Sequence, residues 1–233
     1  MGYRISGLRL RYGERSVFDG LSLELEPHTA TAVLGPSGCG KTSLLMSVAG
    51  LLKQAEADRS GFEGARFGFA FQEPRLLPWL GALDNVAFVL GREMGKVAAL
   101  ERARTYLERV GLGRELAKRP SELSGGMRQR VSLARAFASP SDVLLMDEPF
   151  QSVDPRTRAG LVEAFLELES VERRTVLFVT HDIAEAIRIG DRVCALGGAP
   201  ATIVADIRPE PKDDADRGAL ETRLYSLAFS GRS

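Results

Sequence analysis

Residues 29–42 of the chain are TATAVLGPSGCGKT, an apolar run followed by a loop with three glycines and one lysine. Gly35, Gly40, Lys41 and Thr42 satisfy the pattern G-x-x-x-x-G-K-[ST], which indicates a phosphate-binding loop when a buried strand precedes it and a helix follows. Glycines let backbone N–H groups turn inward, and the positive end of the helix dipole favours an anion. The stretch therefore predicts a strand, a nucleotide-phosphate loop and a helix that extends to about residue 52.

Two side chains of this loop carry the expected chemistry. Lys41 supplies a positive charge for the β- and γ-phosphates, and the Thr42 hydroxyl is expected to ligate Mg²⁺. A glycine turn that contains a lysine by chance is the alternative. Because the chain has five lysines, chance would produce the pattern in roughly one of two hundred such chains.

Further apolar patterns predict the strands around this loop. Residues 8–12 and 21–26 alternate apolar and polar side chains, as in antiparallel strands, and the stretch that ends at Tyr12 alternates with arginines as in an edge strand. The runs VLLM at 143–146 and TVLFVT at 175–180 are continuous, as in parallel strands covered on both faces. The expected fold is α/β, a mixed, mainly parallel sheet with an N-terminal antiparallel β region.

The length of 233 residues suits one core with an inserted lobe. We expect one domain over residues 1–208. Helical spacing begins near Asp84, the expected N-cap, and predicts a helical lobe at about residues 84–138. The tail at 209–233 is charged and contains proline, and the role of its Leu-rich segment LYSLAFS is left open.

Composition disfavours several classes of protein. Lys+Arg and Asp+Glu are equal at 31 each, so no excess positive field attracts nucleic acid or an anionic bilayer. Cys39 and Cys194 lie far apart with no secretory leader before them, which suits reduced thiols in a cytosolic compartment. No apolar run approaches the roughly 18–20 residues of a membrane-spanning helix. Met1, Gly2 and Ser6 fit an N-myristoylation pattern, but the strand-like alternation that follows disfavours it.

Asp147 and Glu148 directly follow the apolar run at 143–146. That places two carboxylates at the carboxyl end of a buried strand, where ligands of open α/β sheets collect. Asp147 is the expected Mg²⁺ ligand, and Glu148 is expected to orient and deprotonate an attacking water. The alternative is a carboxylate pair that merely ends a strand.

His181 follows the second apolar run in the same way. A structural role is its alternative, since Asp182 and Glu185 form a capping-box-like helix start. Asp154 precedes Pro155, and an N-cap with proline at the first helical position would explain that pair without catalysis.

A second glycine loop, LSGGMRQR at 123–130, opens another helix with no lysine in it and no apolar strand before it. The Ser124 hydroxyl and the N–H groups of Gly125 and Gly126 can hold an anion there. A glycine turn between two helices is the alternative.

Together these segments resemble the ATP-binding subunit of an ABC transporter over about residues 3–205, which implies the ABC cassette form of the P-loop NTPase fold. Tyr12 is similar to the aromatic residue that stacks on adenine, and a tyrosine that only faces strand neighbours is the alternative. The other motifs stand in the family's order: GPSGCGKT is similar to Walker A, Gln72 in FAFQEP to the Q-loop, LSGGMRQR to the signature, VLLMDEP to Walker B, SVD at 152–154 to the D-loop and THD at 180–182 to the H-loop.

The resemblance implies an ATPase with ATP and Mg²⁺ as cofactors. The implied catalytic residues are Glu148, His181, Lys41 and Gln72, and the implied Mg²⁺ contacts are Thr42, Gln72 and Asp147. The implied nucleotide-binding residues are Tyr12, Gly35, Pro36, Ser37, Gly38, Cys39, Gly40, Lys41, Thr42, Ser43, Ser124, Gly125, Gly126 and Asp154.

In this family two subunits pack head to tail, so the resemblance implies a homodimer on ATP binding in which Ser124 serves the nucleotide of the other subunit. It also implies an integral membrane permease, a solute-binding protein, no nucleic-acid partner and a peripheral position at the cytoplasmic face of the inner membrane. Leu76, Leu77, Trp79 and Leu80 lack helical or strand periodicity, which predicts a docking surface. In the family this neighbourhood receives the coupling helix of the membrane subunit, and a small local core is the alternative.

Three features depart from the family pattern. Met127 stands where the signature usually has glutamine, and Gln151 stands where the D-loop usually has a small residue. The segment from Leu51 to Gln72 is shorter than usual, which predicts a trimmed antiparallel β portion.

FQEPRLLPW and LSGGMRQRV are most similar to importers of the nitrate, sulfonate, taurine and thiamine-precursor branch. A soluble ABC ATPase acting on nucleic acid or ribosomes is the first alternative, but such proteins tend to have paired cassettes or coiled-coil inserts. A P-loop kinase or switch GTPase is the second, and it would leave residues 123–130, Gln72 and His181 unexplained.

Overall fold

The computed structural model describes residues 2–91, 94–151, 153–210 and 214–229. The chain divides into two compact units. The first joins the residues up to Ala65 with those from Thr175 onward, and the second is Arg66–Arg174. The phosphate loop and His181 therefore belong to the first unit, and Gln72 belongs to the second.

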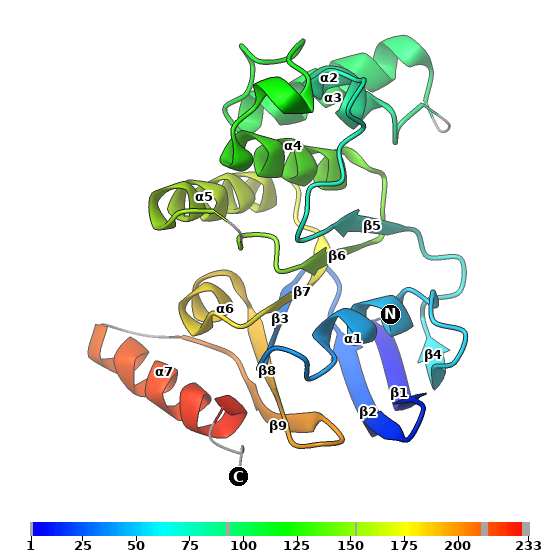
Figure 1. The fold of residues 1–233 in the computed structure, drawn as a ribbon, viewed down its shortest axis with the longest axis vertical. Coiled ribbons are helices and arrows are strands. Elements are labelled where there is room, and N and C mark those ends of the chain that lie inside the picture. Colours follow the sequence, from blue (N-terminus) through cyan, green and yellow to red (C-terminus); the bar gives the residue numbers. More distant parts are fainter. Residues whose placement is uncertain (1, 92–93, 152, 211–213, 230–233) are drawn as a thin grey trace. The chain divides into compact units, whose positions relative to one another are not determined.

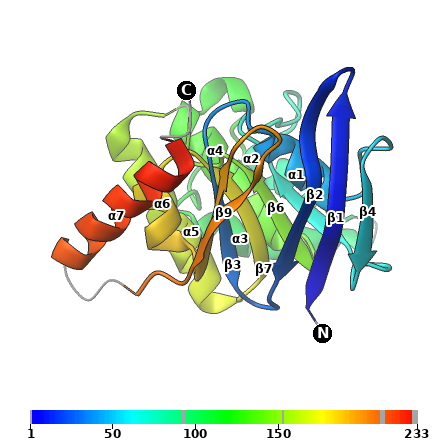
Figure 2. The ribbon, with the colours of Figure 1, turned by 90° about the horizontal axis from the view of Figure 1, so that it is seen from below.

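A three-stranded antiparallel sheet begins the first unit, with the strand order β2-β1-β4 (Figures 1 and 2). Its strands are β1 (Tyr3–Tyr12), β2 (Arg15–Leu25) and β4 (Glu56–Ser60). The expectation of an edge strand is wrong, because β1 lies in the middle and pairs with β4 as far as Arg9. β4 has the sequence EADRS, which carries no apolar strand signal. The antiparallel portion between residues 51 and 72 is thus one five-residue strand.

The strand that precedes the phosphate loop lies in the middle of a second group of strands. β3 (Ala30–Leu34) pairs in parallel with β7 (Thr175–Thr180) and with β8 (Arg192–Gly197). β9 (Thr202–Ile207) pairs antiparallel with β8. Every residue of β3 and β7 is buried, as the continuous apolar runs predict.

The helices of the first unit are α1 (Lys41–Val48), α6 (Ile183–Ile189) and α7 (Asp214–Phe229). α1 ends four residues earlier than expected, because Ala49 is its C-cap and Gly50 follows with a left-handed φ of 72°. α7, the red helix in Figure 1, contacts β8, β9 and α6. It buries Leu224 and Ala228, so residues 224–229 of the Leu-rich segment are part of a packed helix.

The second unit places helices around a parallel strand pair. The pair consists of β5 (Phe67–Ala70) and β6 (Val143–Asp147). The ring of Phe165 lies edge-on to Phe137 and to Phe150, with centroids 5.5 and 5.9 Å away. These contacts pack the chain after β6 against α5 (Pro155–Val171), and they pack α5 against α4 (Gly125–Ala138). The helical elements are α2 (Ala82–Ala87), α3 (Lys96–Arg109), the 3₁₀ turn η1 (Pro120–Glu122), α4 (Gly125–Ala138) and α5 (Pro155–Val171).

The expectation that Asp84 caps a helix is wrong, because α2 begins at residue 82 with Gly81 as its N-cap. The cause is Asn85, whose side chain braces the preceding loop. Its Oδ1 accepts from the Leu77 N–H at 2.7 Å, and its Nδ2 donates to the carbonyls of Leu77 and Leu80 at 3.1 and 3.0 Å. These hydrogen bonds hold the loop in a conformation from which α2 begins two residues before Asp84.

Candidate functional site

The phosphate loop of the first unit depends on its glycines. It starts directly after β3, where the Gly35 N–H donates to the Thr180 carbonyl at 3.4 Å. Gly40 has a φ of 106°, and a Cβ there would lie 2.5 Å from Val17 Cγ1 and 2.9 Å from Phe18 Cζ. A side chain at residue 40 would therefore be strained and would collide with β2. α1 begins at the next residue, so the loop ends on a helix N-terminus.

Lys41 is buried within this loop, with 5% of its surface exposed. Its Nζ donates to the carbonyl oxygens of Gly35 and Pro36 at 2.9 and 3.2 Å. These bonds hold the ammonium group inside the loop, where the phosphates of a nucleotide would lie. Thr42 and Ser43 follow on the first turn of α1, and Thr42 is exposed.

Tyr12 ends β1 beside the first turn of α1. Its hydroxyl is 3.4 Å from Ser43 Oγ, and 47% of the residue is exposed. An exposed aromatic ring beside the helix that leaves the phosphate loop is suited to stack on a base.

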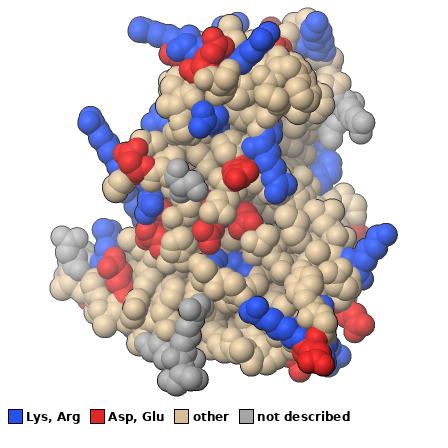
Figure 3. Space-filling model, in the orientation of Figure 1, with Lys and Arg blue, Asp and Glu red and all other residues tan. Residues whose placement is uncertain are grey.

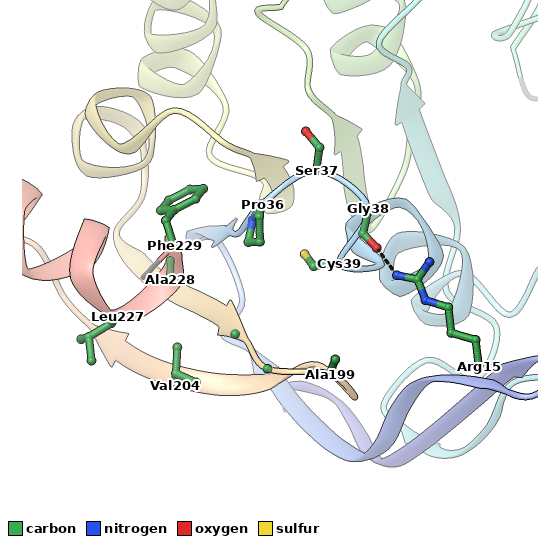
Figure 4. A pocket seen from close by; sticks show the side chains of 12 residues that line it. Arg15, Pro36, Ser37, Gly38, Cys39, Ala199, Val204, Leu227, Ala228 and Phe229 are labelled. Carbon is green, nitrogen blue, oxygen red and sulfur yellow. Dashed lines mark hydrogen bonds between the residues drawn. The ribbon is translucent and has the colours of Figure 1, made fainter. Parts of the chain in front are cut away.

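A cavity of about 490 Å³ flanks the phosphate loop (Figure 4). Its walls include Pro36–Cys39, the turn at 197–199 and the end of α7 at Phe229. Figure 4 shows Arg15 of β2 reaching the loop, where its guanidinium donates to the Gly38 carbonyl at 2.9 Å. This hydrogen bond tethers the outer side of the loop to β2.

His181 and the phosphate loop leave the strands of the first unit at the same edge. β3 and β7 are parallel, with Leu34 opposite Thr180, so Gly35 and His181 both follow paired residues. His181 is exposed. This edge is where ligands of open α/β sheets bind.

Residues next to His181 account for the start of α6. Asp182 is the N-cap and accepts from the Glu185 N–H at 3.1 Å. The Thr180 hydroxyl donates to Glu185 Oε2 at 2.9 Å and accepts from the Asp182 N–H at 3.0 Å. The hydrogen bonds of Thr180, Asp182 and Glu185 account for the start of α6, so capping of this helix does not require a histidine at residue 181.

The second unit brings Gln72, Asp147 and Glu148 to one edge. β5 and β6 are parallel, with Ala70 opposite Met146. Asp147 is the last residue of β6, and Gln72 follows the end of β5 by two residues. Gln72 is exposed, whereas Asp147 and Glu148 are half-buried.

Glu148 has a left-handed backbone, with a φ of 44°. In a residue other than glycine this conformation costs on the order of 1–3 kcal/mol, and such strain clusters at functional sites. The Glu148 carbonyl accepts from the Gln151 N–H at 3.1 Å, which closes a turn after β6. Gln151 is buried, and Ser152 of the expected D-loop lies outside the described residues.

The signature segment opens α4 in the second unit. Ser124 is the N-cap, and its Oγ accepts from the N–H of half-buried Met127 at 3.3 Å. Ser124 and Gly125 are exposed, whereas Gly126 is buried. A Cβ at Gly126 would lie 2.2 Å from Cγ2 of Thr157, so α4 and α5 approach too closely for a side chain there. The exposed N-cap forms a cradle suited to an anion.

Asp154 is the N-cap of α5, as the Asp-Pro pair predicts. Its Oδ1 accepts from the N–H groups of Arg156 and Thr157, both at 3.1 Å. A hydrogen bond from the Thr157 side chain holds the pKa of Asp154 below its usual value. Thr157 thus connects the D-loop cap with the signature glycine that it contacts.

Comparison with known proteins identifies the kind of protein that carries these motifs. Residues 18–151 match the protein-family model described as ABC transporter. The chain belongs to the ABC transporter family. The relative named aliphatic sulfonates import ATP-binding protein SsuB 1, from Xanthomonas axonopodis pv. citri, is 42% identical over 94% of this chain and 92% of its own length. SsuB 2 from Streptomyces avermitilis is 44% identical over 98% of this chain and 90% of its own length.

Solved structures of ABC cassettes have the same fold. The dimeric, post-hydrolysis state of the ATP-binding cassette MJ0796 with ADP and Pi is 26% identical, with a TM-score of 0.75 over 89% of this chain and 99% of that one. A second dimeric structure of MJ0796 has a TM-score of 0.76. These findings confirm the expected ABC cassette fold. They also confirm the expected ATP-binding and ATP-hydrolysing subunit of an ABC importer, a role that implies a permease partner.

The ABC cassette exposes apolar side chains where the sequence predicts a docking surface. Trp79 is 66% exposed, whereas Leu76, Leu77 and Leu80 are half-buried. A small local core would explain why the leucines are half-buried, but it would not explain why Trp79 is exposed. Among the residues that the structure describes, no helix is long and apolar enough to cross a membrane.

An apolar cavity of about 280 Å³ adjoins this segment between α2 and α3. Phe88 and Val97, at the end of α2 and the start of α3, are 65% and 72% exposed. On the face drawn in Figure 3, basic and acidic side chains are interspersed. The residues that line this α2–α3 cavity are Leu80, Asp84, Ala87, Phe88, Gly91, Lys96, Ala99 and Leu100.

The sequence does not single out two residues of α4 that contact the Q-loop segment of the ABC cassette. Gln129 donates to the Gln72 carbonyl, and Arg135 donates to the carbonyls of Pro74 and Arg75. Their only sequence signal is a polar residue among apolar ones in QRVSLARAFA, which does not indicate a partner some sixty residues away.

Proposed function

We propose that this ABC cassette binds and hydrolyses MgATP to drive the import of an alkanesulfonate through a separate permease. The observation that carries the proposal is the buried Lys41 ammonium group, held by its own loop at the N-terminus of α1. The sulfonate class is supported by relatives about 40% identical over most of this chain whose names state that solute.

The nucleotide would lie along the loop-bearing edge of the first unit. Lys41 and the first N–H groups of α1 would hold the β- and γ-phosphates, since a helix N-terminus and an ammonium group both favour an anion. Tyr12 would stack on adenine, because its exposed ring lies beside Ser43 on α1. His181, exposed at the same edge, would donate a hydrogen bond to the transferring phosphoryl group.

The oxygen donors of Thr42, Gln72 and Asp147 fit Mg²⁺, which prefers hard oxygen ligands and keeps several waters. Thr42 offers an exposed hydroxyl on α1, and Asp147 offers a carboxylate at the end of β6. When bound, Mg²⁺ supplies positive charge to the phosphate oxygens.

Glu148 would orient the attacking water and accept its proton. A positioned carboxylate suits this role because phosphoryl transfer depends mostly on placement and charge stabilisation. Its left-handed backbone, closed by the Gln151 hydrogen bond, fixes where the side chain leaves the edge of β6.

ATP would join two copies of the chain, with Ser124 of one copy facing the phosphates held by Lys41 of the other. The exposed Ser124 cap supports this, because its own loop contains no lysine. A cavity of about 380 Å³ beside Ser124 is also lined by Arg130, Arg156 and Glu115, so its lining carries two basic side chains and one acidic side chain. The dimeric state of the solved MJ0796 cassettes is consistent with this arrangement.

Trp79 and the α2–α3 cavity would receive the permease. Apolar surface of this kind is unfavourable in water and typical of protein contacts. The cassette would then lie peripherally at the cytoplasmic face of the inner membrane. A solute-binding protein would deliver the sulfonate from the other side, and no nucleic acid would take part.

The test is purification of the chain from its host membranes with whatever integral membrane protein accompanies it, followed by reconstitution in vesicles. Uptake of radiolabelled ethanesulfonate should require ATP on the cassette side and a sulfonate-binding protein, and should stop with Glu148→Gln. ATP hydrolysis stimulated by RNA or ribosomes, without a membrane partner, would contradict the proposal.

A further inference from the structure

Two side chains of α4 donate hydrogen bonds to three backbone carbonyls, those of Gln72, Pro74 and Arg75. Gln129, with 3% of its surface exposed, donates through Nε2 to the Gln72 carbonyl at 2.6 Å. The Arg135 guanidinium donates to the carbonyls of Pro74 and Arg75 at 2.7 and 3.0 Å. Two polar side chains of one helix thus hold the main chain of residues 72–75.

The spacing of the two side chains matches the loop. Gln129 and Arg135 are six positions apart, which is about 9 Å along a helix axis. The three steps from Gln72 to Arg75 span at most about 10 Å of extended chain. One side chain can therefore bind each end of the segment.

The other side of the segment is also constrained. Phe71 stacks on Phe69 with ring centroids 5.4 Å apart and planes at 9°. The Arg75 guanidinium lies 4.0 Å from the centre of the Phe71 ring. Arg75 has a left-handed φ of 45°, a conformation that persists where surrounding contacts hold it. The Gln72 backbone is thus fixed between β5 and α4.

Buried donors of this kind are sensitive to substitution. Burial lowers the pKa of Arg135, and its carbonyl bonds partly compensate for the water that the guanidinium has lost. Replacing Gln129 by an apolar residue would leave the Gln72 carbonyl without this donor, which is unfavourable in a partly buried place.

We propose that Gln129 is a positioning residue, which holds the Gln72 backbone where the Gln72 side chain reaches Mg²⁺. Arg135 is the second anchor of the same loop. α4 begins at the Ser124 cap, so one helix carries both the signature serine and the anchor of Gln72. The inference rests on the proposed role of Gln72 in Mg²⁺ binding and catalysis.

Hydrogen exchange on the nucleotide-free chain tests the structural half. Gln129→Met keeps the side-chain length but removes the amide, and amide exchange in a peptide spanning residues 71–77 should become about tenfold faster, the factor for one lost hydrogen bond. Ser132→Ala is the matched control, since Ser132 is equally buried in α4 and its Oγ has no partner among the described residues. Unchanged exchange in Gln129→Met would overturn the proposal.

A double-mutant cycle tests the functional half. Gln129→Met should lower kcat about tenfold and raise the half-saturating Mg²⁺ concentration, whereas Ser132→Ala should change neither. In the Gln72→Ala background the same substitution should change kcat by less than about twofold, because it acts through Gln72. Multiplicative losses in the double variant would refute the positioning role and leave the role of Gln72 intact. An unchanged kcat in Gln72→Ala would instead refute the proposed role of Gln72, and the inference with it.

Discussion

Lys41 Nζ lies 2.9 Å from the carbonyl oxygen of Gly35, so the charged side chain of the phosphate loop folds back onto the first residue of that loop. The ammonium group is held in place before any phosphate arrives. A pre-positioned charge needs little rearrangement on binding, and its removal leaves an uncompensated anion in the site.

We expect Lys41→Ala to weaken binding of a fluorescent ATP analogue about 100-fold or more, since charge-assisted hydrogen bonds to the phosphates are lost. Fluorescence anisotropy measures this directly. Lys53→Ala, at an exposed lysine just beyond α1, is the control and should bind normally. Retained affinity in Lys41→Ala would remove the lysine from the phosphate site.

Glu148→Gln should lower ATP turnover by about 10²- to 10³-fold, the loss typical of one positioned catalytic group, while ATP binding survives. With ATP this variant should elute from a sizing column as a dimer. Ser124→Arg in the same background should return it to a monomer, because the N-cap cradle is filled. Monomers under every condition would speak against ATP as the link between copies.

Gly126→Ala should lower the free energy of unfolding by about 1–3 kcal/mol, because the new methyl group would overlap Thr157. Urea denaturation measures the change. Gly125→Ala is the matched control, since a Cβ there would have its nearest neighbour at 4.0 Å. Adding Thr157→Ser, which removes the overlapping Cγ2 and keeps the hydroxyl, should recover part of the loss. A fully stable Gly126→Ala would show that α4 and α5 do not meet at this point.

The ion pair between Arg192 and Asp206 predicts that part of the free energy of unfolding depends on pH. The Arg192 guanidinium bonds to both Asp206 oxygens, at 2.7 and 2.5 Å, and this holds the pKa of Asp206 below its usual value. The ion pair therefore stabilises the fold fully above an unfolded-state pKa of about 3.9, and the contribution is lost as the pH falls through the lower folded-state pKa. Asp206→Asn should be less stable than the parent at pH 7, and the difference should shrink toward pH 2. Glu63→Gln, at an exposed carboxylate, should show no such change. A difference that stays constant with pH would contradict the prediction.

Phe88→Glu combined with Trp79→Glu should abolish co-purification with the permease, because each carboxylate would have to be desolvated in an apolar contact. ATPase activity of the isolated cassette should stay within about twofold, because both side chains are exposed. Val171→Glu, which alters an exposed apolar residue of α5, is the control and should keep the permease. Normal co-purification of the double variant would place the membrane partner elsewhere.

Local patterns predicted much of this molecule. The phosphate loop, the buried strands and the Asp154 cap each depend on residues within a few positions of one another, so short sequence windows contain the whole signal. The position of β1 was not predictable in this way. Its second neighbour is EADRS, which has no apolar alternation to mark it as a strand and follows β1 by more than forty residues.

Long-range contacts between side chains and backbone were also outside the reach of the sequence. Asn85 decides where α2 starts, and Gln129 and Arg135 hold a loop that lies about sixty residues earlier. A glutamine or arginine in a helix is usually solvated, so composition gives no reason to expect these contacts. The backbone strain at Glu148 depends on a turn whose closing residue, Gln151, departs from the family pattern.

The position of the end of α7 limits where a tag or label can be attached to this protein. Phe229 lines the cavity whose opposite wall is Pro36–Cys39, so a tag or fluorescent fusion joined after it would crowd the ATP-binding loop and depress activity by itself. β1 carries the chain about 30 Å from Tyr3 to Tyr12, and Tyr12 is the residue near α1. Labels and surface attachments therefore belong at the amino end, a full strand length from the nucleotide.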